Sequence, residues 1–187
     1  LWTLVVTAVT AFSVAGPAEV LLPYLTQEKF DDGPLAFGSL LAAVGIGAAV
    51  GAITVSSRGL PRHYLTVLTL GSAAGMLPLI LIGNTSVFPI MAAAAVAIGL
   101  VQGTALVIRA TLLQRRVPRE KLGRVASVDV FVTLALVPVS TAVTGVLSEL
   151  VSAEAIFAVA GCIPIVAAII AVVAARMNRD ELTHPLR

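Results

Sequence analysis

Six long apolar runs restrict what this chain of 187 residues can fold into. About 20 apolar residues wound as a helix match the roughly 30 Å hydrocarbon core of a bilayer. Inside lipid every backbone polar group needs an internal partner, and runs such as MAAAAVAIGLV lack the alternation of barrel strands. We therefore predict an all-α membrane protein with six transmembrane helices. The predicted spans are about residues 1–25, 34–56, 64–83, 87–113, 125–148 and 153–175.

The composition agrees with this class. Only 12% of the residues are charged, about half the share in a soluble domain. The net charge of +2 does not indicate a nucleic-acid partner, because the basic residues occupy short connectors between apolar runs. Cys162 has no second cysteine to pair with, and His63 and His184 fall in a connector and in the tail. We expect no catalytic residue, no metal site and no cofactor.

The basic residues also predict the direction of the spans. Eleven of the twelve lie at alternate connectors and in the tail, all on one side of the predicted bundle. Short cytoplasmic loops are enriched in Lys and Arg, so both termini are predicted to be cytoplasmic. The eleven are Arg58, Arg62, Arg109, Arg115, Arg116, Arg119, Lys121, Arg124, Arg176, Arg179 and Arg187.

Polar side chains follow one face of three predicted helices. The first run carries Thr3, Thr7, Thr10 and Ser13; the fifth carries Asp129, Thr133, Ser140 and Thr144; and the fourth carries Gln102 and Arg109, seven residues apart. Such spacings keep residues on one helix face. We expect these three helices to border a polar space or one another, with Thr7, Thr10 and Gln102 lining a substrate pathway. Hydrogen bonding between helices is the alternative for any single Ser or Thr.

Two carboxylates fall inside apolar runs, where a charge is costly. Glu19 is a candidate for binding protons or substrate, and an outer-rim or structural role is the alternative. Asp129 is expected to pair with Arg109, Arg124 or another loop arginine. Snorkelling to the inner surface is an alternative for Arg109.

Glycine and proline predict close packing and kinks. Three glycine pairs are spaced four apart, at 47 and 51, 71 and 75, and 99 and 103, as in helices that approach closely. Kinks are expected at Pro17, Pro23, Pro78, Pro138 and Pro164. Pro138 is the strongest candidate for a functional kink, because polar residues flank it.

The segment TLLQRRVPREKLGRVASVDVFVTLALVPVSTAVTGVLSE resembles the carboxy-terminal half of major facilitator superfamily transporters, and within them the macrolide-efflux or drug/proton antiporter branch. Upstream, LLPYLTQEKF and GPLAFGSLLAAVGIGAAVGA resemble the seventh and eighth helices of that family. The residues that carry the first resemblance are Gln114, Val117, Pro118, Gly123, Arg124, Val125, Ser127, Pro138, Gly145 and Glu149.

This resemblance implies a six-helix half of a twelve-helix transporter, built from two three-helix inverted repeats. Substrate would lie between this half and a missing amino-terminal half, or a second copy, with alternating access. The first and fourth helices would line the cavity, the third and sixth would face lipid, and the second and fifth would meet the other half. The chain begins at Leu1 in an apolar run with no basic leader, so we expect upstream sequence to be missing.

The implied function is efflux of small lipophilic, drug-like compounds across the plasma membrane, coupled to proton entry. Candidates for the cytoplasmic loop and gate are Arg58, Arg62, Arg109, Gly123, Arg124 and Asp129. The family's G-x-x-x-D-R-x-G-R motif survives only between Gly51 and Arg62 and lacks its acidic residue, so an electrostatic latch is not carried over. The alternatives are a non-transporting scaffold or an inactive truncated remnant. A membrane-embedded enzyme is disfavoured, because no predicted span contains a histidine base.

Overall fold

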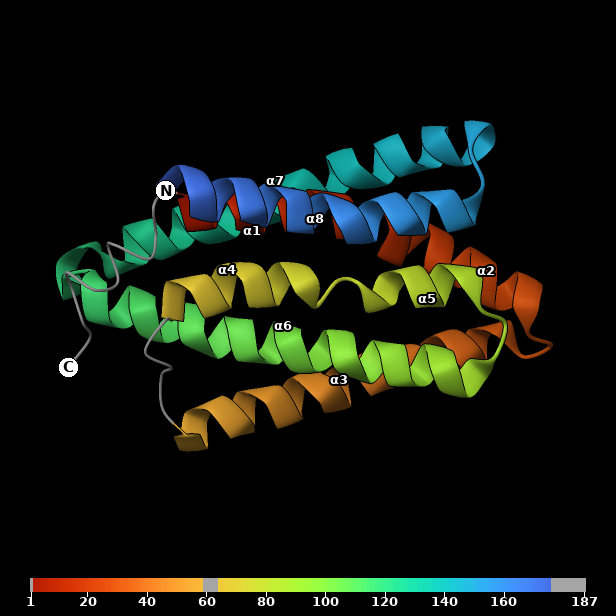
Figure 1. Cartoon of the computed structure of the whole chain (residues 1–187), viewed down its shortest axis with the longest axis horizontal. Coiled ribbons are helices and arrows are strands. Elements are labelled where there is room, and N and C mark those ends of the chain that lie inside the picture. Colours follow the sequence, from red (N-terminus) through yellow and green to blue (C-terminus); the bar gives the residue numbers. More distant parts are fainter. Residues whose placement is uncertain (1, 59–63, 176–187) are drawn as a thin grey trace.

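The chain folds into long helices that run side by side (Figure 1). The structure is a computed structural model that describes residues 2–58 and 64–175, and these residues contain helices without any strand. The elements are α1 (Trp2–Gly16), a π-helical turn η1 (Pro17–Leu21), α2 (Leu22–Lys29), α3 (Gly33–Arg58), α4 (Tyr64–Ala74), α5 (Pro78–Asn84), α6 (Phe88–Arg116), α7 (Arg119–Leu150) and α8 (Ala153–Ala175).

Five helical stretches of the described residues are long and apolar enough to cross a bilayer. The segment Leu68–Asn84, made of α4 and α5, is apolar but shorter. The prediction of a helical membrane protein is confirmed at this level, and the count of six crossings stays a prediction. The five long stretches are Val5–Lys29, Gly33–Ser57, Phe88–Arg115, Arg119–Leu150 and Ala153–Ala174.

The basic connector is shorter than predicted. The predicted spans left residues 114–124 as a loop, but α6 continues to Arg116 and α7 begins at Arg119. Charged residues such as Arg, Lys and Glu form helices readily, so an apolar pattern alone ends the helix too early. The interruption falls at Val117 and Pro118, because proline restricts the residue before it to extended conformations.

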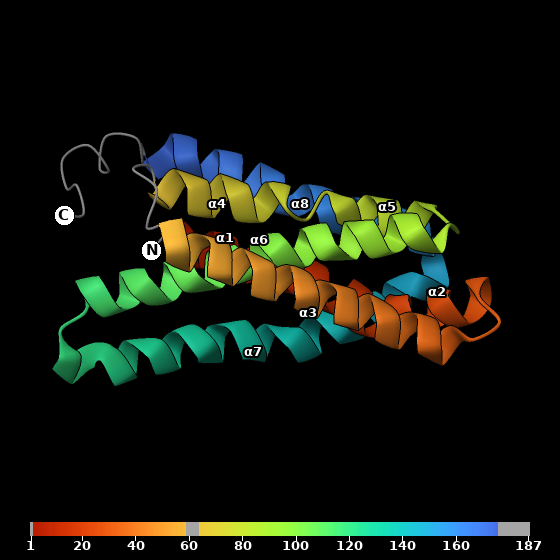
Figure 2. The same ribbon diagram turned by 90° about the horizontal axis from the view of Figure 1, so that it is seen from below.

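Helix α3 packs against α6 along nearly its whole length, while α1 packs between α7 and α8 (Figure 1). The two short helices α4 and α5 lie against α8 on one side and α6 on the other. Helix α7 stands apart from α3 and meets α6 only weakly, as the turned view shows (Figure 2). Among the long spans of the described residues, α7 is the one least covered by the rest of the chain.

The α3–α6 contact depends on two of the predicted glycine pairs. A methyl group added to Gly47, Gly51, Gly99 or Gly103 would lie 2.0 or 2.1 Å from a carbonyl oxygen of the facing helix. The backbones therefore touch with no side chain between them, as small residues at such spacings allow. These two pairs confirm the predicted close packing. In the third pair only Gly75 is packed, against Val101 of α6, and Gly71 faces open space.

Helices α1 and α7 are joined through a hydroxyl. The Gly16 amide donates to Ser140 Oγ at 2.8 Å, and the Ser140 hydroxyl donates to the Phe12 carbonyl. Ser140 and Thr144 are both buried, and a Cβ on Gly16 would lie 2.0 Å from Thr144 Oγ1. For Ser140 of the polar face on the fifth run, the structure supports the alternative of hydrogen bonding between helices.

The prolines act in different ways along the chain. The third predicted run breaks at Gly75–Leu77, and Pro78 begins α5 because a proline fits the first turn of a helix. Pro17 begins η1, where the helix widens to a π turn. Helices α7 and α8 continue through Pro138 and Pro164. The break at Pro78 confirms that kink, and the functional role of Pro138 stays a prediction.

Lys29, the one basic residue predicted on the outer side, ends α2 and reaches the end of α5. Its Nζ donates to the carbonyl oxygens of Gly83 and Thr85, each at 2.9 Å. A cation at these last carbonyls also opposes the negative end of the helix dipole. Lys29 therefore links the first and third predicted spans, which accounts for a lysine on the side otherwise poor in basic residues.

Replacing Lys29 with methionine should lower the free energy of unfolding by about 1–3 kcal/mol, because two charge-assisted hydrogen bonds are lost. Thermal unfolding of the purified protein in detergent measures the change. The control is Lys121→Met, which removes the same charge from an exposed position on α7. Equal melting temperatures for the two variants would show that the Lys29 contacts add no stability.

Candidate functional site

A cavity of about 320 Å³ opens between α1, α4 and α6. Its wall is mostly apolar, with Val137 of α7 at one edge and Met76 from the break between α4 and α5. The apolar lining residues are Ala11, Val14, Ala15, Leu68, Met76, Val101, Ala105, Leu106 and Val137. The polar ones are Thr7, Thr10, Ser72, Gln102 and Arg109. An apolar pocket with a few convergent polar groups is the usual form of a small-molecule site.

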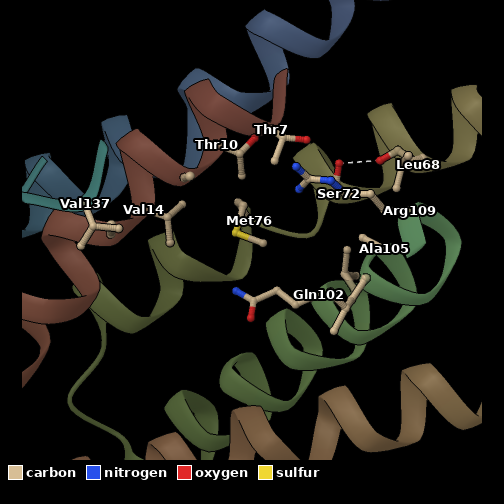
Figure 3. Close-up of a pocket in the computed structure, with 14 residues that line it drawn as sticks. Thr7, Thr10, Val14, Leu68, Ser72, Met76, Gln102, Ala105, Arg109 and Val137 are labelled. Carbon is tan, nitrogen blue, oxygen red and sulfur yellow. Dashed lines mark hydrogen bonds between the residues drawn. The ribbon is translucent and has the colours of Figure 1, made fainter. Parts of the chain in front are cut away.

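Two hydroxyls of the cavity wall are held by their own helices. Thr10 Oγ1 donates to the Val6 carbonyl at 2.8 Å, and Ser72 Oγ donates to the Leu68 carbonyl. Each hydroxyl still presents lone pairs on its oxygen as hydrogen-bond acceptors. The Gln102 side chain is exposed and points into the cavity (Figure 3). The cavity can therefore offer both donors and acceptors to a ligand.

Arg109 lies on the cavity wall, within the helix that also carries Gln102, although it was also a candidate for the cytoplasmic loop. It precedes the end of α6 by seven residues, about 10 Å of helix rise, and its side chain is partly buried. The guanidinium extends toward Thr7 and Ser72 (Figure 3). A single helical face thus brings Gln102 and Arg109 to one cavity, together with Thr7 and Thr10 from α1.

Glu19 lies elsewhere. It is on η1 with an exposed side chain and is not among the residues that line the cavity. Pro17 and Leu21 are buried four residues apart on the packed face of this turn, so Glu19 between them points away from the bundle. Glu19 therefore lies in an apolar span but not at the cavity, and its role in binding protons or substrate stays a prediction.

The remaining predicted residues are scattered or lie outside the described residues. Gly123 and Arg124 are exposed near the start of α7, and Pro138 is exposed beside the lining residue Val137. The side chains of Arg58 and Asp129, and the whole of Arg62, fall outside the described residues. The expected pairing of Asp129 with a loop arginine stays a prediction.

Sequence reasoning missed the contribution of the third predicted span, which the structure forms as α4, α5 and the break between them. The resemblance implied that this helix faces lipid, yet Leu68, Ser72 and Met76 line the cavity. Ser72 is one of few polar residues in its apolar run, which is the signal that was available. The sixth predicted span is α8. It exposes one apolar face, with Ile169, Ile170 and Val173 among its exposed residues, and packs the other face around Phe157.

Polar residues of α7 border a different depression. An apolar groove of about 250 Å³ lies between α1, α7 and α8 and includes Ser13, Ser140 and Thr144. Ser13 donates to the Val9 carbonyl of its own helix, whereas Ser140 donates to the Phe12 carbonyl and so joins α7 to α1. Over the described residues, no group of three or more His, Cys, Asp or Glu is placed to hold a metal.

Bilayer-length apolar helices around a small, sparsely polar cavity define a multi-pass helical membrane protein. The sequence model of the Major Facilitator Superfamily matches residues 1–186, and the chain belongs to this family. Members of this family are transporters, so membership indicates a membrane transport function. Comparison with curated proteins and with solved structures gave no match.

Proposed function

We propose that this chain is half of a secondary transporter that exports small lipophilic, drug-like compounds in exchange for protons. The cavity between α1, α4 and α6 carries the proposal. It has the volume of a small-molecule site, apolar walls and a few polar groups contributed by three helices. In this proposal Thr7, Thr10 and Gln102 line the substrate pathway, as predicted from their spacing.

The proposed partner of this half is an amino-terminal half of six helices, or a second copy. Apolar faces of α3 and α7 support this arrangement. Only 11% of the α7 span is buried inside the chain, against 28–33% in the other four long spans. The α7 residues Phe131, Leu134 and Val146 are 63–71% exposed, as is Ile53 of α3 at 69%. We propose that the two halves rock about this seam in the plasma membrane to give alternating access.

Proton exchange needs a titrating group, and Glu19 is the candidate in this proposal. It lies within the helical stretch Val5–Lys29, where a carboxylate is costly unless it has a partner or a task. Its exposed position lets it face the second half rather than the cavity. In this proposal Glu19 acts at the contact between the halves and not among the substrate contacts.

Reconstitution into vesicles with an imposed pH gradient tests the proposal. The full-length protein should move at least one lipophilic dye from a panel of cationic, neutral and anionic dyes, and a protonophore should stop the movement. Glu19→Gln should reduce gradient-driven transport at least about tenfold while passive dye exchange persists. Exposed Glu28→Gln, at the end of α2, is the control. Folded protein that moves no dye would favour a scaffold or remnant; unchanged transport by Glu19→Gln would remove Glu19 from the coupling step.

Orientation is tested by labelling. A cysteine at exposed Arg119, in a Cys162→Ala background, should react in intact cells only with a membrane-permeant thiol reagent, because the basic connector is proposed to be cytoplasmic. A cysteine at exposed Ser86, between α5 and α6, should react with an impermeant reagent. The reverse pattern would invert the topology.

A further inference from the structure

The apolar groove between α1, α7 and α8 runs along its helices for the depth of one leaflet. Its α7 wall follows one helix face, with Ser140, Val143, Thr144, Leu147 and Val151. From Val151 to Ser140 the wall covers about 16 Å of helix rise. The whole hydrocarbon core of a bilayer is roughly 30 Å thick, so the groove reaches from the α7–α8 connector to about the midplane.

The groove has a buried floor and exposed rims. Thr144 and Ala160 on the floor are each 4% exposed, whereas the rim residues Val143 and Val159 are 41% and 55% exposed. Helices α7 and α8 are joined through only two residues, yet they contact each other weakly, because α1 packs between them. The groove is therefore open sideways to the medium that surrounds α7 and α8.

That medium is lipid, since both rims belong to helices of bilayer length. Water is a poor occupant, because a buried water needs two to four polar partners and the groove is lined almost wholly by apolar side chains. The hydroxyls of Ser13 and Ser140 already donate to carbonyl oxygens. An empty groove would leave its wall without contacts on one side. A hydrocarbon chain satisfies both conditions.

The face of α7 that we assign to the second half of the transporter lies opposite the groove. Val146 is two residues from Thr144, which is about 200° around the helix. Phe131 is nine residues from Ser140, which is about 180° around it. A partner covering Phe131 and Val146 would leave the groove open to lipid.

The mouth of the groove is acidic. Glu149 and Glu154 flank the connector and are exposed, and residues 149–154 include no lysine or arginine. Lys29 interacts electrostatically with Glu154, but its Nζ is held by the carbonyl oxygens of Gly83 and Thr85. A headgroup within about 8–10 Å of the carboxylates feels their charge. They favour a headgroup that carries an amine over one that is only anionic.

We propose that this groove binds one acyl chain of a zwitterionic phospholipid from the leaflet beside the α7–α8 connector. The chain would lie between the rims formed by Val143 and Val159, over the floor formed by Thr144 and Ala160. The headgroup amine would lie near Glu149 and Glu154. This inference is independent of the proposed transport function and needs only the membrane placement of α7 and α8.

Photocrosslinking in vesicles tests the site. The probes are a phosphatidylcholine and a phosphatidylglycerol, each with a diazirine halfway along one chain, in vesicles of equal parts of the two lipids. Adducts are mapped by mass spectrometry of the digested protein. With phosphatidylcholine we expect the yield at Leu147 and Val159 to exceed that at exposed Ile169 and Ile170, which face the other leaflet, at least about fivefold.

Variants assign the adducts to the groove. Ala155→Phe places a ring in the groove and should reduce the adducts at Leu147 and Val159 to the level at Ile169. Ala142→Phe adds the same ring to an exposed position on the far side of α7 and should leave them unchanged. If Ala155→Phe is not monodisperse, Val143→Phe on the exposed rim takes its place.

The headgroup preference has its own variants. Phosphatidylglycerol should give roughly threefold fewer groove adducts than phosphatidylcholine, because its net charge is repelled by the carboxylates. The double variant Glu149→Gln and Glu154→Gln should bring the two yields together, whereas Glu28→Gln, exposed on α2, should not.

Equal adduct yields in the groove and at Ile169 would overturn the inference, because ordinary lipid contact would then explain both. Absence of adducts from the groove would overturn it by showing that something other than lipid covers this face. Equal yields for the two probes in the unmodified protein would overturn the assignment of the headgroup.

Discussion

Gly99→Ala is expected to destabilise the protein strongly, as one of the tightest glycine positions among the described residues. The added Cβ would lie 2.0 Å from the Val44 carbonyl oxygen and 2.8 Å from its carbon, which are backbone atoms and have no rotamer to adopt. Helices α3 and α6 would have to separate along their main contact. We expect a loss of about 3 kcal/mol or more in the free energy of unfolding, at the upper end of overpacking effects.

The matched control is Gly45→Ala on α3, because a Cβ there meets nothing within 4 Å. Alanine is the better helix former by roughly 1 kcal/mol, so this variant should be neutral or slightly more stable. Thermal unfolding of detergent-solubilised protein, followed by size-exclusion chromatography, compares the two. Similar melting temperatures for Gly99→Ala and Gly45→Ala would show that α3 and α6 are not in backbone contact.

Filling the cavity should abolish transport without unfolding the protein. Ala105 lies on the α6 wall, and a phenylalanine there would occupy much of the 320 Å³ space, which is open enough to receive a ring. We expect the rate of dye transport in vesicles to fall at least about tenfold, because the substrate and the ring compete for one volume. The melting temperature should change little.

Ala174→Phe provides the comparison for this variant. It adds the same ring to an exposed position near the end of α8, away from the cavity. Transport should continue in this variant at close to the unmodified rate. Full transport by Ala105→Phe would place the substrate pathway outside this cavity, whatever the substrate class.

The helical class and the close packing were predictable because both depend on local chemistry. Uninterrupted apolar runs require helices in lipid, and the glycines of α3 and α6 recur at the spacing that allows backbone contact. The residue at which α6 ends and the residue at which α7 begins were not predictable from hydropathy, because Arg115 and Arg119 extend helices as readily as apolar residues do. Only Pro118 marked the true interruption.

The cavity was half predictable. Helical spacing, seven residues for Gln102 and Arg109 and three for Thr7 and Thr10, placed each pair on one helix face, and the structure brings the two faces together. Met76 lies in the break at Gly75–Leu77, which the spacing of polar residues does not reveal, and the contribution of Ser72 depends on how α4 packs beside α6. The outward direction of Glu19 depends on which residues of η1 pack inward, and this too is a tertiary property.

Because the α3 and α6 backbones meet at glycines, no rotamer change can let one helix slide past the other. The pair is expected to move as a single rigid body. Helix α7 differs, since its main contact is α1, through the hydroxyl bridge of Ser140 and the close approach of Gly16. Widening of the space beside Arg109 would therefore come from a joint displacement of α1 and α7, with the α3–α6 pair as the stationary frame.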